Sequence, residues 1–86
     1  MASEELGTVD FSTFIVSLAT NVMMHLGEGP EGARAPVDLG LAKQTIDIIE
    51  MLDEKTSGNR TDDEDQLMKG VLYQLRMAYV SKTQAS

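Results

Sequence analysis

The stretch from Phe11 to Gly27 most constrains how this chain can fold, because it contains no Asp, Glu, Lys or Arg. The preceding residue, Asp10, can cap a helix, since its side-chain oxygen can accept a backbone N–H that the first turn leaves unpaired. Gly27 can end the helix by adopting left-handed backbone. We therefore predict a helix over residues 11–26 that carries no acidic side chain, lysine or arginine on any side.

The two faces of this predicted helix differ in polarity but not in charge. The inner face is apolar and comprises Phe11, Phe14, Ile15, Leu18, Ala19, Val22 and Leu26. The opposite face comprises Thr13, Ser17, Thr20, Asn21 and Met24. Because solvated helix faces usually carry charged side chains, we expect both faces to be covered, the second one partly by another protein chain. The alternative is a polar face that is simply exposed to solvent.

Length and composition favour the same interpretation. The chain has 86 residues, enough for one core, and a domain of this size buries only ~60 to 65% of the surface that its unfolded chain exposes. It has no cysteine, so disulfides, thiolate catalysis and cysteine-based metal sites are excluded. A partner chain is then the natural source of additional buried surface.

Two further helices are predicted, over residues 39–57 and 62–80. Asp38 can cap the first of them, and Thr61 with Glu64 forms the capping-box pattern at the start of the second. The apolar half of the first is Leu39, Leu41, Ala42, Thr45, Ile46, Ile48, Ile49 and Leu52. The buried stripe of the second is Leu67, Met68, Val71, Leu72, Leu75 and Tyr79.

These segments predict an all-α domain of three helices over residues 10–80. The turn around Gly58 is short, so the second and third helices are expected to form an antiparallel hairpin, with the first helix packed across it.

Three segments are expected to lie outside this compact part. These are a disordered N-terminal tail over residues 1–9, a flexible linker rich in glycine and proline over residues 27–37, and a frayed end over residues 81–86.

A second contact surface is predicted on the third helix, where Gly70, Tyr73 and Met77 lie outside the buried stripe. Glycine in a helix interior costs ~1 kcal/mol relative to alanine, so close contact with another backbone would rationalise Gly70. We predict that these three residues bind a partner together with Thr13, Ser17, Thr20, Asn21 and Met24. The expected assembly is a homo-oligomer, a dimer or higher, and another protein is the alternative partner.

The segment from Asp53 to Glu64 has most of the pattern of an EF-hand calcium loop, with a carboxylate at its first and twelfth positions. Its third position is Lys55, whose ammonium cannot ligate a cation, and its eighth is Arg60 in place of an apolar residue. We therefore interpret the segment as a hairpin turn. The acidic residues 62–65 point in different directions around a helix, so they are interpreted as complementing the helix dipole and not as a metal site.

No catalytic residue, cofactor or metal ligand is predicted, and the chain is interpreted as a non-enzyme. His25 is its only histidine, and the position near the end of a helix favours an end-capping or packing role. No glycine-rich phosphate loop, zinc-protease motif or serine-hydrolase motif is present.

Single-stranded nucleic acid binding is the alternative function. Lys69, Tyr73 and Arg76 fall on one stripe of the third helix and combine basic and aromatic side chains. However, two cations are few, and the net charge of −7 repels phosphate. The pattern therefore favours the protein-binding interpretation.

A cytoplasmic location is expected. The first residues are acidic, whereas a secretory signal begins with basic residues followed by an apolar run. The stretch from Phe11 to Gly27 is shorter than the ~20 apolar residues that span a bilayer, and it contains several polar side chains.

Several blocks of the chain resemble a small bacterial family, the domain of unknown function numbered 1844. The most specific of these blocks are Ala42-Lys43-Gln44-Thr45-Ile46-Asp47 and Leu75-Arg76-Met77-Ala78-Tyr79, and the resemblance covers roughly residues 10–80. It implies a helical, cytosolic bacterial protein, and it transfers no catalytic or ligand-binding residues.

Overall fold

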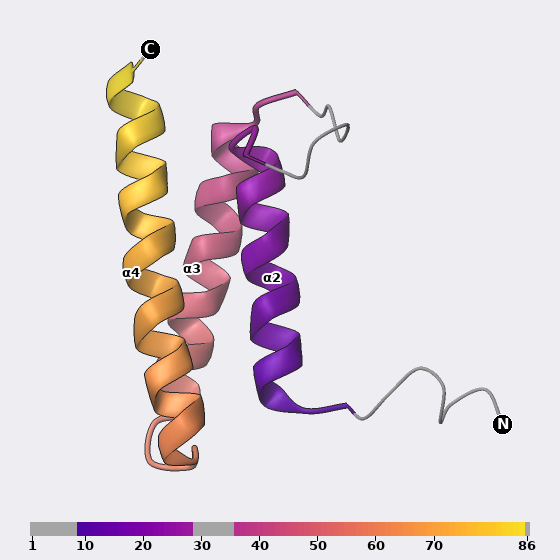
Figure 1. The fold of residues 1–86 in the computed structure, drawn as a ribbon, viewed down its shortest axis with the longest axis vertical. Coiled ribbons are helices and arrows are strands. Elements are labelled where there is room, and N and C mark those ends of the chain that lie inside the picture. Colours follow the sequence, from indigo (N-terminus) through magenta and orange to yellow (C-terminus); the bar gives the residue numbers. More distant parts are fainter. Residues whose placement is uncertain (1–8, 29–35, 86) are drawn as a thin grey trace, which may run out of the picture.

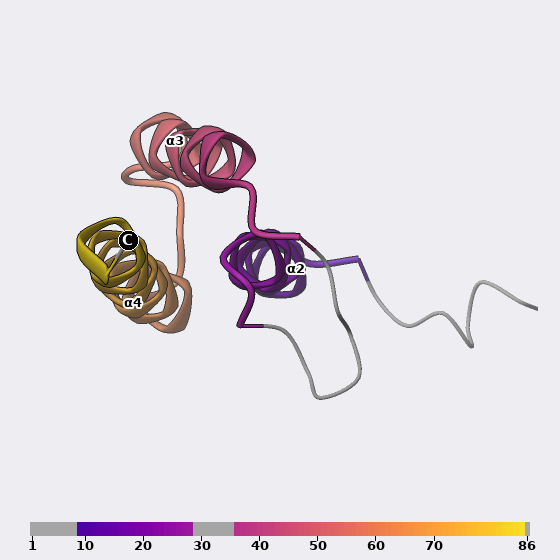
Figure 2. The same ribbon diagram turned by 90° about the horizontal axis from the view of Figure 1, so that it is seen from above.

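The computed structural model describes residues 9–28 and 36–85, which form three α-helices. These are α2 (Phe11–His25), α3 (Leu39–Lys55) and α4 (Asp62–Ala85). The chain direction alternates from one helix to the next (Figure 1), and in the end-on view the three helices lie at the corners of a triangle (Figure 2). The predicted all-α domain, with α2 packed on the hairpin of α3 and α4, is confirmed.

Each helix starts at the cap that the sequence predicts. The Asp10 carboxylate accepts a hydrogen bond of 2.7 Å from the backbone N–H of Thr13, and the Asp38 carboxylate accepts one of 3.0 Å from that of Leu41. At the start of α4, Thr61 and Glu64 exchange hydrogen bonds of 2.9 and 3.1 Å between side chain and backbone N–H, which completes the capping box.

The end of α2 is closed by two backbone hydrogen bonds around Gly27, whose φ is +80°. The N–H of Gly27 donates to the Met24 carbonyl at 3.0 Å, and that of Glu28 donates to the Met23 carbonyl at 2.8 Å. This is a Schellman motif, in which the left-handed residue directs two backbone N–H groups to carbonyls of the last turn of the helix. The predicted role of Gly27 is therefore confirmed.

The core lies along the axis of the triangle and takes side chains from all three helices. Its buried members are Ile15, Val22, Leu26, Ala42, Ile46, Ile49, Met68, Leu72 and Leu75. Full burial of one large apolar side chain contributes roughly 1.5–3 kcal/mol, so this small core limits the stability of the single chain.

Three residues that were expected on buried faces lie further out. Phe14 of α2 is 49% exposed, and Leu41 and Ile48 of α3 are also exposed. Phe14 precedes the buried Ile15 and points ~100° away from it around the helix. Within residues 9–28 and 36–85, two other helices are available to cover α2. The buried arc of each helix is consequently narrower than its apolar arc.

The last helix is longer than expected and reaches Ala85, so the prediction that it ends at residue 80 and frays beyond it is wrong. No glycine or proline follows Tyr79 to stop it. In addition, Lys82 forms an ion pair of 2.8 Å with Glu28, which ties the final turns of α4 to the end of α2.

The other two predicted helices end at His25 and Lys55, one and two residues earlier than expected. Most of the predicted N-terminal tail and most of the predicted linker lie outside the described residues.

Candidate protein-binding surface

The side of α2 that faces away from the core is uncovered. Thr13, Ser17, Thr20 and Asn21 are exposed, and Met24 is half-buried. Val16, which the sequence analysis assigned to neither face, also belongs to this side and is 46% exposed. We call Thr13, Val16, Ser17, Thr20, Asn21 and Met24 the outer face of α2.

Two hydroxyl groups of the outer face already have acceptors within α2. Ser17 Oγ donates to the Thr13 carbonyl at 3.0 Å, and Thr20 Oγ1 donates to the Val16 carbonyl at 3.0 Å. A hydroxyl that hydrogen-bonds its own helix needs no partner from solvent, so its removal from water leaves no unpaired donor. The outer face is therefore less polar than its sequence suggests.

An open groove separates α2 from α4 beside this face. It has a volume of about 420 Å³ and is lined by Val16, Ala19, Thr20, Met23, Glu28, Val71, Gln74 and Leu75. A more open depression of about 590 Å³ adjoins it, lined by Ser12, Thr13, Val16, Ser17, Thr20 and Leu67. Both are lined largely by apolar and small polar side chains, and Glu28 is the one charged residue among them.

The α4 wall of this groove was not predicted, because the sequence pattern places Leu67, Val71 and Leu75 together in one buried stripe. In the structure Leu75 is buried, whereas Leu67 and Val71 are only partly buried. The signal was present in the width of the stripe: Leu67 lies ~100° around the helix from the buried Met68, at the edge of the apolar arc.

The structure places the three predicted contact residues of α4 elsewhere. Gly70, Tyr73 and Met77 are exposed, with Tyr73 at 66% and Met77 at 55%. None of them lines the groove in the part of the chain that the structure describes. A Cβ atom at Gly70 would meet nothing within 4 Å, so the single chain itself gives no reason for glycine there.

The basic stripe proposed for nucleic acid is partly neutralised. Arg76 forms an ion pair of 2.9 Å with Glu50 of α3, and Nε of Arg76 donates to the same carboxylate at 3.0 Å. Lys69 is exposed on the same stripe as Tyr73. Because phosphate affinity depends on the number of cations that can neutralise phosphates, this pairing weakens the nucleic-acid hypothesis, which stays a prediction.

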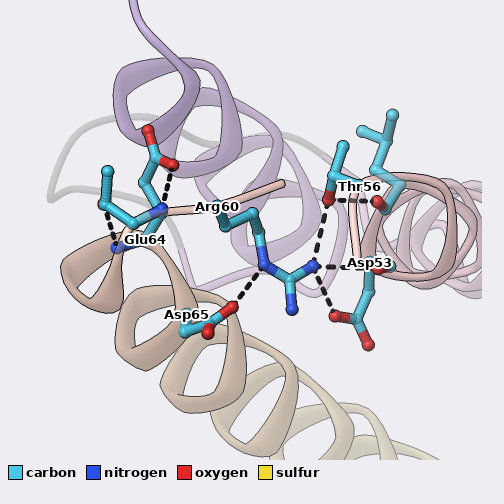
Figure 3. A network of polar contacts seen from close by, with 7 residues as sticks. Asp53, Thr56, Arg60, Glu64 and Asp65 are labelled. Carbon is cyan, nitrogen blue, oxygen red and sulfur yellow. Dashed lines mark hydrogen bonds and ion pairs between the residues drawn. The ribbon is translucent and has the colours of Figure 1, made fainter. Parts of the chain in front are cut away.

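The turn between α3 and α4 is organised around the Arg60 guanidinium, whose side chain is only 9% exposed (Figure 3). Nη1 donates to the Asp53 carbonyl at 2.8 Å, to Asp53 Oδ1 at 2.9 Å and to Thr56 Oγ1 at 3.0 Å, while Nε donates to Asp65 Oδ1 at 2.6 Å. The hydrogen bond to Asp65, followed by that to Asp53, raises the pKa of Arg60 above its ordinary value.

This arrangement supports the interpretation of residues 53–64 as a hairpin turn. Arg60 binds the carboxylates of Asp53 and Asp65, whereas Glu64, the twelfth residue of the calcium-loop pattern, accepts a hydrogen bond from the Thr61 N–H. The carboxylates at the first and twelfth positions of the pattern are thus engaged by different partners within the turn. Gly58 has a φ of +83°, which is left-handed backbone within this turn. Within residues 9–28 and 36–85, no group of three metal-ligating side chains is found.

His25 lies in the last turn of α2 and is half-buried. Its backbone carbonyl accepts a hydrogen bond of 2.7 Å from the N–H of Asp38, which joins the end of α2 to the start of α3.

None of the three helices, over the ranges that the structure describes, has the length and hydropathy of a membrane span.

A family model described as a domain of unknown function, DUF1844, matches residues 8–81. The match covers all of α2 and α3 and most of α4, and it confirms the resemblance seen in the sequence. No curated protein and no solved structure matches the chain significantly.

Proposed function

We propose that this chain, which belongs to the DUF1844 family, a domain of unknown function, is a non-enzymatic module that binds protein chains. The partner is a second copy of the chain or another protein, and it binds through the outer face of α2. The supporting observation is that α2 carries no Asp, Glu, Lys or Arg over its full length and yet has one whole side uncovered. The other two helices carry charged side chains on their exposed sides.

Burial of the outer face would remove apolar surface from water, and the free-energy cost of desolvating its polar groups would be small. Val16 is nearly half exposed in the single chain, and the hydroxyls of Ser17 and Thr20 are already hydrogen-bonded. Each Å² of apolar surface removed from water contributes ~25 cal/mol, and no charge has to be desolvated. A partner helix with a small-residue face could therefore pack closely here.

The non-enzymatic part of the proposal rests on composition. The chain has no cysteine and one histidine, so the common nucleophile and base pairs have few candidates. The cytoplasmic location and the oligomeric state expected from the sequence also remain predictions.

The first test places a charge in the middle of the outer face. Ser17→Glu introduces a good helix former at an exposed position, so folding should be retained. Binding of a partner would then bury an unpaired carboxylate. We expect Ser17→Glu to lose the association that the wild type shows, measured as molar mass by light scattering and as retention of chains from a native extract on the immobilised protein.

The matched control is Gln44→Glu, which adds the same charge at an exposed position of α3 outside the outer face. Circular dichroism should show equal helix content for both variants and the wild type. Association that is equally strong in Ser17→Glu and the wild type would contradict the proposal.

A further inference from the structure

Charge is distributed very unevenly over this molecule. The chain carries 14 acidic and 7 basic residues, but none of them lies between Asp10 and Glu28. Four of the cations are held in ion pairs within the chain: Lys43 with Asp47, Arg60 with Asp53 and Asp65, Arg76 with Glu50, and Lys82 with Glu28. The outer face of α2 is thus the uncharged side of a strongly acidic protein.

This pattern distinguishes between two kinds of partner. A basic partner would be attracted by acidic groups on the binding face, so such a face would be expected to carry them. A second copy of this chain has the same negative charge and would be repelled by them. At a two-fold interface each residue also lies near the same surface of the other copy, so a single acid there would introduce two like charges. The absence of acidic residues from the outer face therefore favours a second copy, and Glu28, which lines the adjoining groove, is already paired with Lys82.

More acidic groups lie at one end of the molecule than at the other. Asp10 and the acidic first turn of α4, residues 62–65, lie at the same end, because α2 and α4 run in the same direction (Figure 1). Among the residues that the structure describes, the opposite end holds fewer acidic groups, namely Asp38, which is hydrogen-bonded to His25, and Glu28, which is paired with Lys82. An antiparallel arrangement of two copies would keep the acidic ends apart, whereas a parallel one would place them together.

We propose, on the basis of the function proposed above, that two copies of this chain pack α2 against α2 in antiparallel orientation about a two-fold axis, each α2 lying along the other copy's groove between α2 and α4. The outer face fits this symmetry. With the axis at the level of Leu18 and Ala19, Thr13 lies opposite the partner's Met24, and Ser17 lies opposite the partner's Thr20. The exposed Val16, which lines the groove of its own copy, then also faces the other copy.

The groove walls are needed as well as α2 itself. With 15 residues, α2 is about 22 Å long, and a stable interface buries about 800 Å² on each partner, more than one short helix face supplies. The partly buried Leu67 and Val71 of α4 supply the additional apolar surface beside it. The dimer would thus have a continuous core from α2 and α4 of both copies.

Disulfide cross-linking tests this register, because the natural chain has no cysteine and single cysteines can be introduced without background. A disulfide requires the two Cα atoms to lie within ~7 Å of each other. We expect a mixture of Thr13→Cys and Met24→Cys to form mixed disulfide dimers under mild oxidation, on the order of 10-fold faster than either variant alone, because the dimer raises the effective concentration of that pair. Gln44→Cys on α3 gives the rate of random collision.

Each other outcome overturns the inference. Preferential cross-linking of Thr13→Cys with itself would indicate parallel packing, and a mixture that reacts no faster than Gln44→Cys would exclude the α2 interface. A monomer by light scattering at all concentrations up to the millimolar range would exclude the dimer. Melting curves by circular dichroism check that each cysteine variant is folded.

Failure of this inference can be separated from failure of the proposed function. If cross-linking fails but Ser17→Glu still abolishes retention of a different chain, the outer face binds another protein and only the dimer is wrong. If Ser17→Glu changes neither the molar mass nor the retention of other chains, both proposals are wrong.

Discussion

Gly27 and Gly58 both adopt left-handed backbone, with φ of +80° and +83°, but their surroundings differ. A Cβ atom at Gly27 would lie 3.0 Å from Cγ2 of Val37, whereas one at Gly58 would meet nothing within 4 Å. The two positions therefore separate the cost of a backbone conformation from the cost of a steric contact.

We expect Gly58→Ala to lower the free energy of unfolding by ~1–2 kcal/mol, the cost of left-handed backbone for an L-residue with a side chain. Gly27→Ala should lower it further, because Val37 must also move. Urea denaturation at a fixed protein concentration measures both. Gly58→Asn is the control, since asparagine tolerates left-handed backbone and should cost less than alanine. Equal losses for Gly27→Ala and Gly58→Ala would contradict the predicted contact.

Asp10 gives the start of α2 a dependence on pH. The hydrogen bond from the Thr13 backbone N–H to its carboxylate lowers the pKa of Asp10 in the folded chain below its ordinary value of 3.8. Because the folded pKa is lowered, the ionised carboxylate stabilises the fold above pH 3.8. This contribution is lost as the pH falls below 3.8 through the lowered folded pKa.

Asp10→Asn should keep the cap but remove this titration, since asparagine caps helices about as well as aspartate. We expect the free energy of unfolding of the wild type to fall relative to that of Asp10→Asn on going from neutral pH to below the folded pKa. Parallel urea titrations over that range measure the difference. A difference that does not change with pH would show that the carboxylate gives α2 no specific support.

At the scale of the helices, Gly70 is a feature of α4 that the single chain does not explain. It lies within the helix, is exposed, and has open space where a Cβ atom would be. Gly70→Ala should therefore raise the free energy of unfolding by ~0.5–1 kcal/mol at low protein concentration, through better helix propensity. Chemical denaturation measures this effect, and a loss of stability would contradict it.

The same variant tests the sequence-based prediction that Gly70 contacts a partner. If another backbone approaches α4 closely there, the added methyl group should weaken association even while it stabilises the helix, and light scattering at high concentration would detect the change. Unchanged association would restrict the interface to α2 and its groove.

The local sequence predicts the helix starts well and the helix ends less well. Caps depend on contacts within one turn, so Asp10, Asp38 and the Thr61–Glu64 box could be recognised from spacing alone. The end of α4 was predicted too early because the pair of Lys82 with Glu28 joins residues far apart in the sequence. The Arg60 network joins residues that are close in the sequence, but it was not predicted because it depends on how the turn brings the end of α3 to the start of α4.

For the whole molecule, the periodicity of apolar residues predicts which elements pack, and the structure decides how far the burial extends. The three-helix arrangement was predicted because each helix has one apolar arc, and the core residues Ile15, Ile49 and Met68 lie at the centres of these arcs. Phe14 and Ile48 lie at their edges. Whether an edge position is buried depends on where the neighbouring helices lie, and with two neighbours for each helix the edges remain open.

The candidate interface shows the same division. The sequence by itself determined that α2 is uncharged and that Ser17, Thr20 and Asn21 lie opposite its core side, because a helix turns by ~100° per residue whatever surrounds it. Only the tertiary structure decided that α4 leaves a groove beside Val16, that Gly70 and Tyr73 lie away from that groove, and that Arg76 is paired. Those features depend on the distance and orientation between helices, which are set by the packing of side chains that are distant in the sequence.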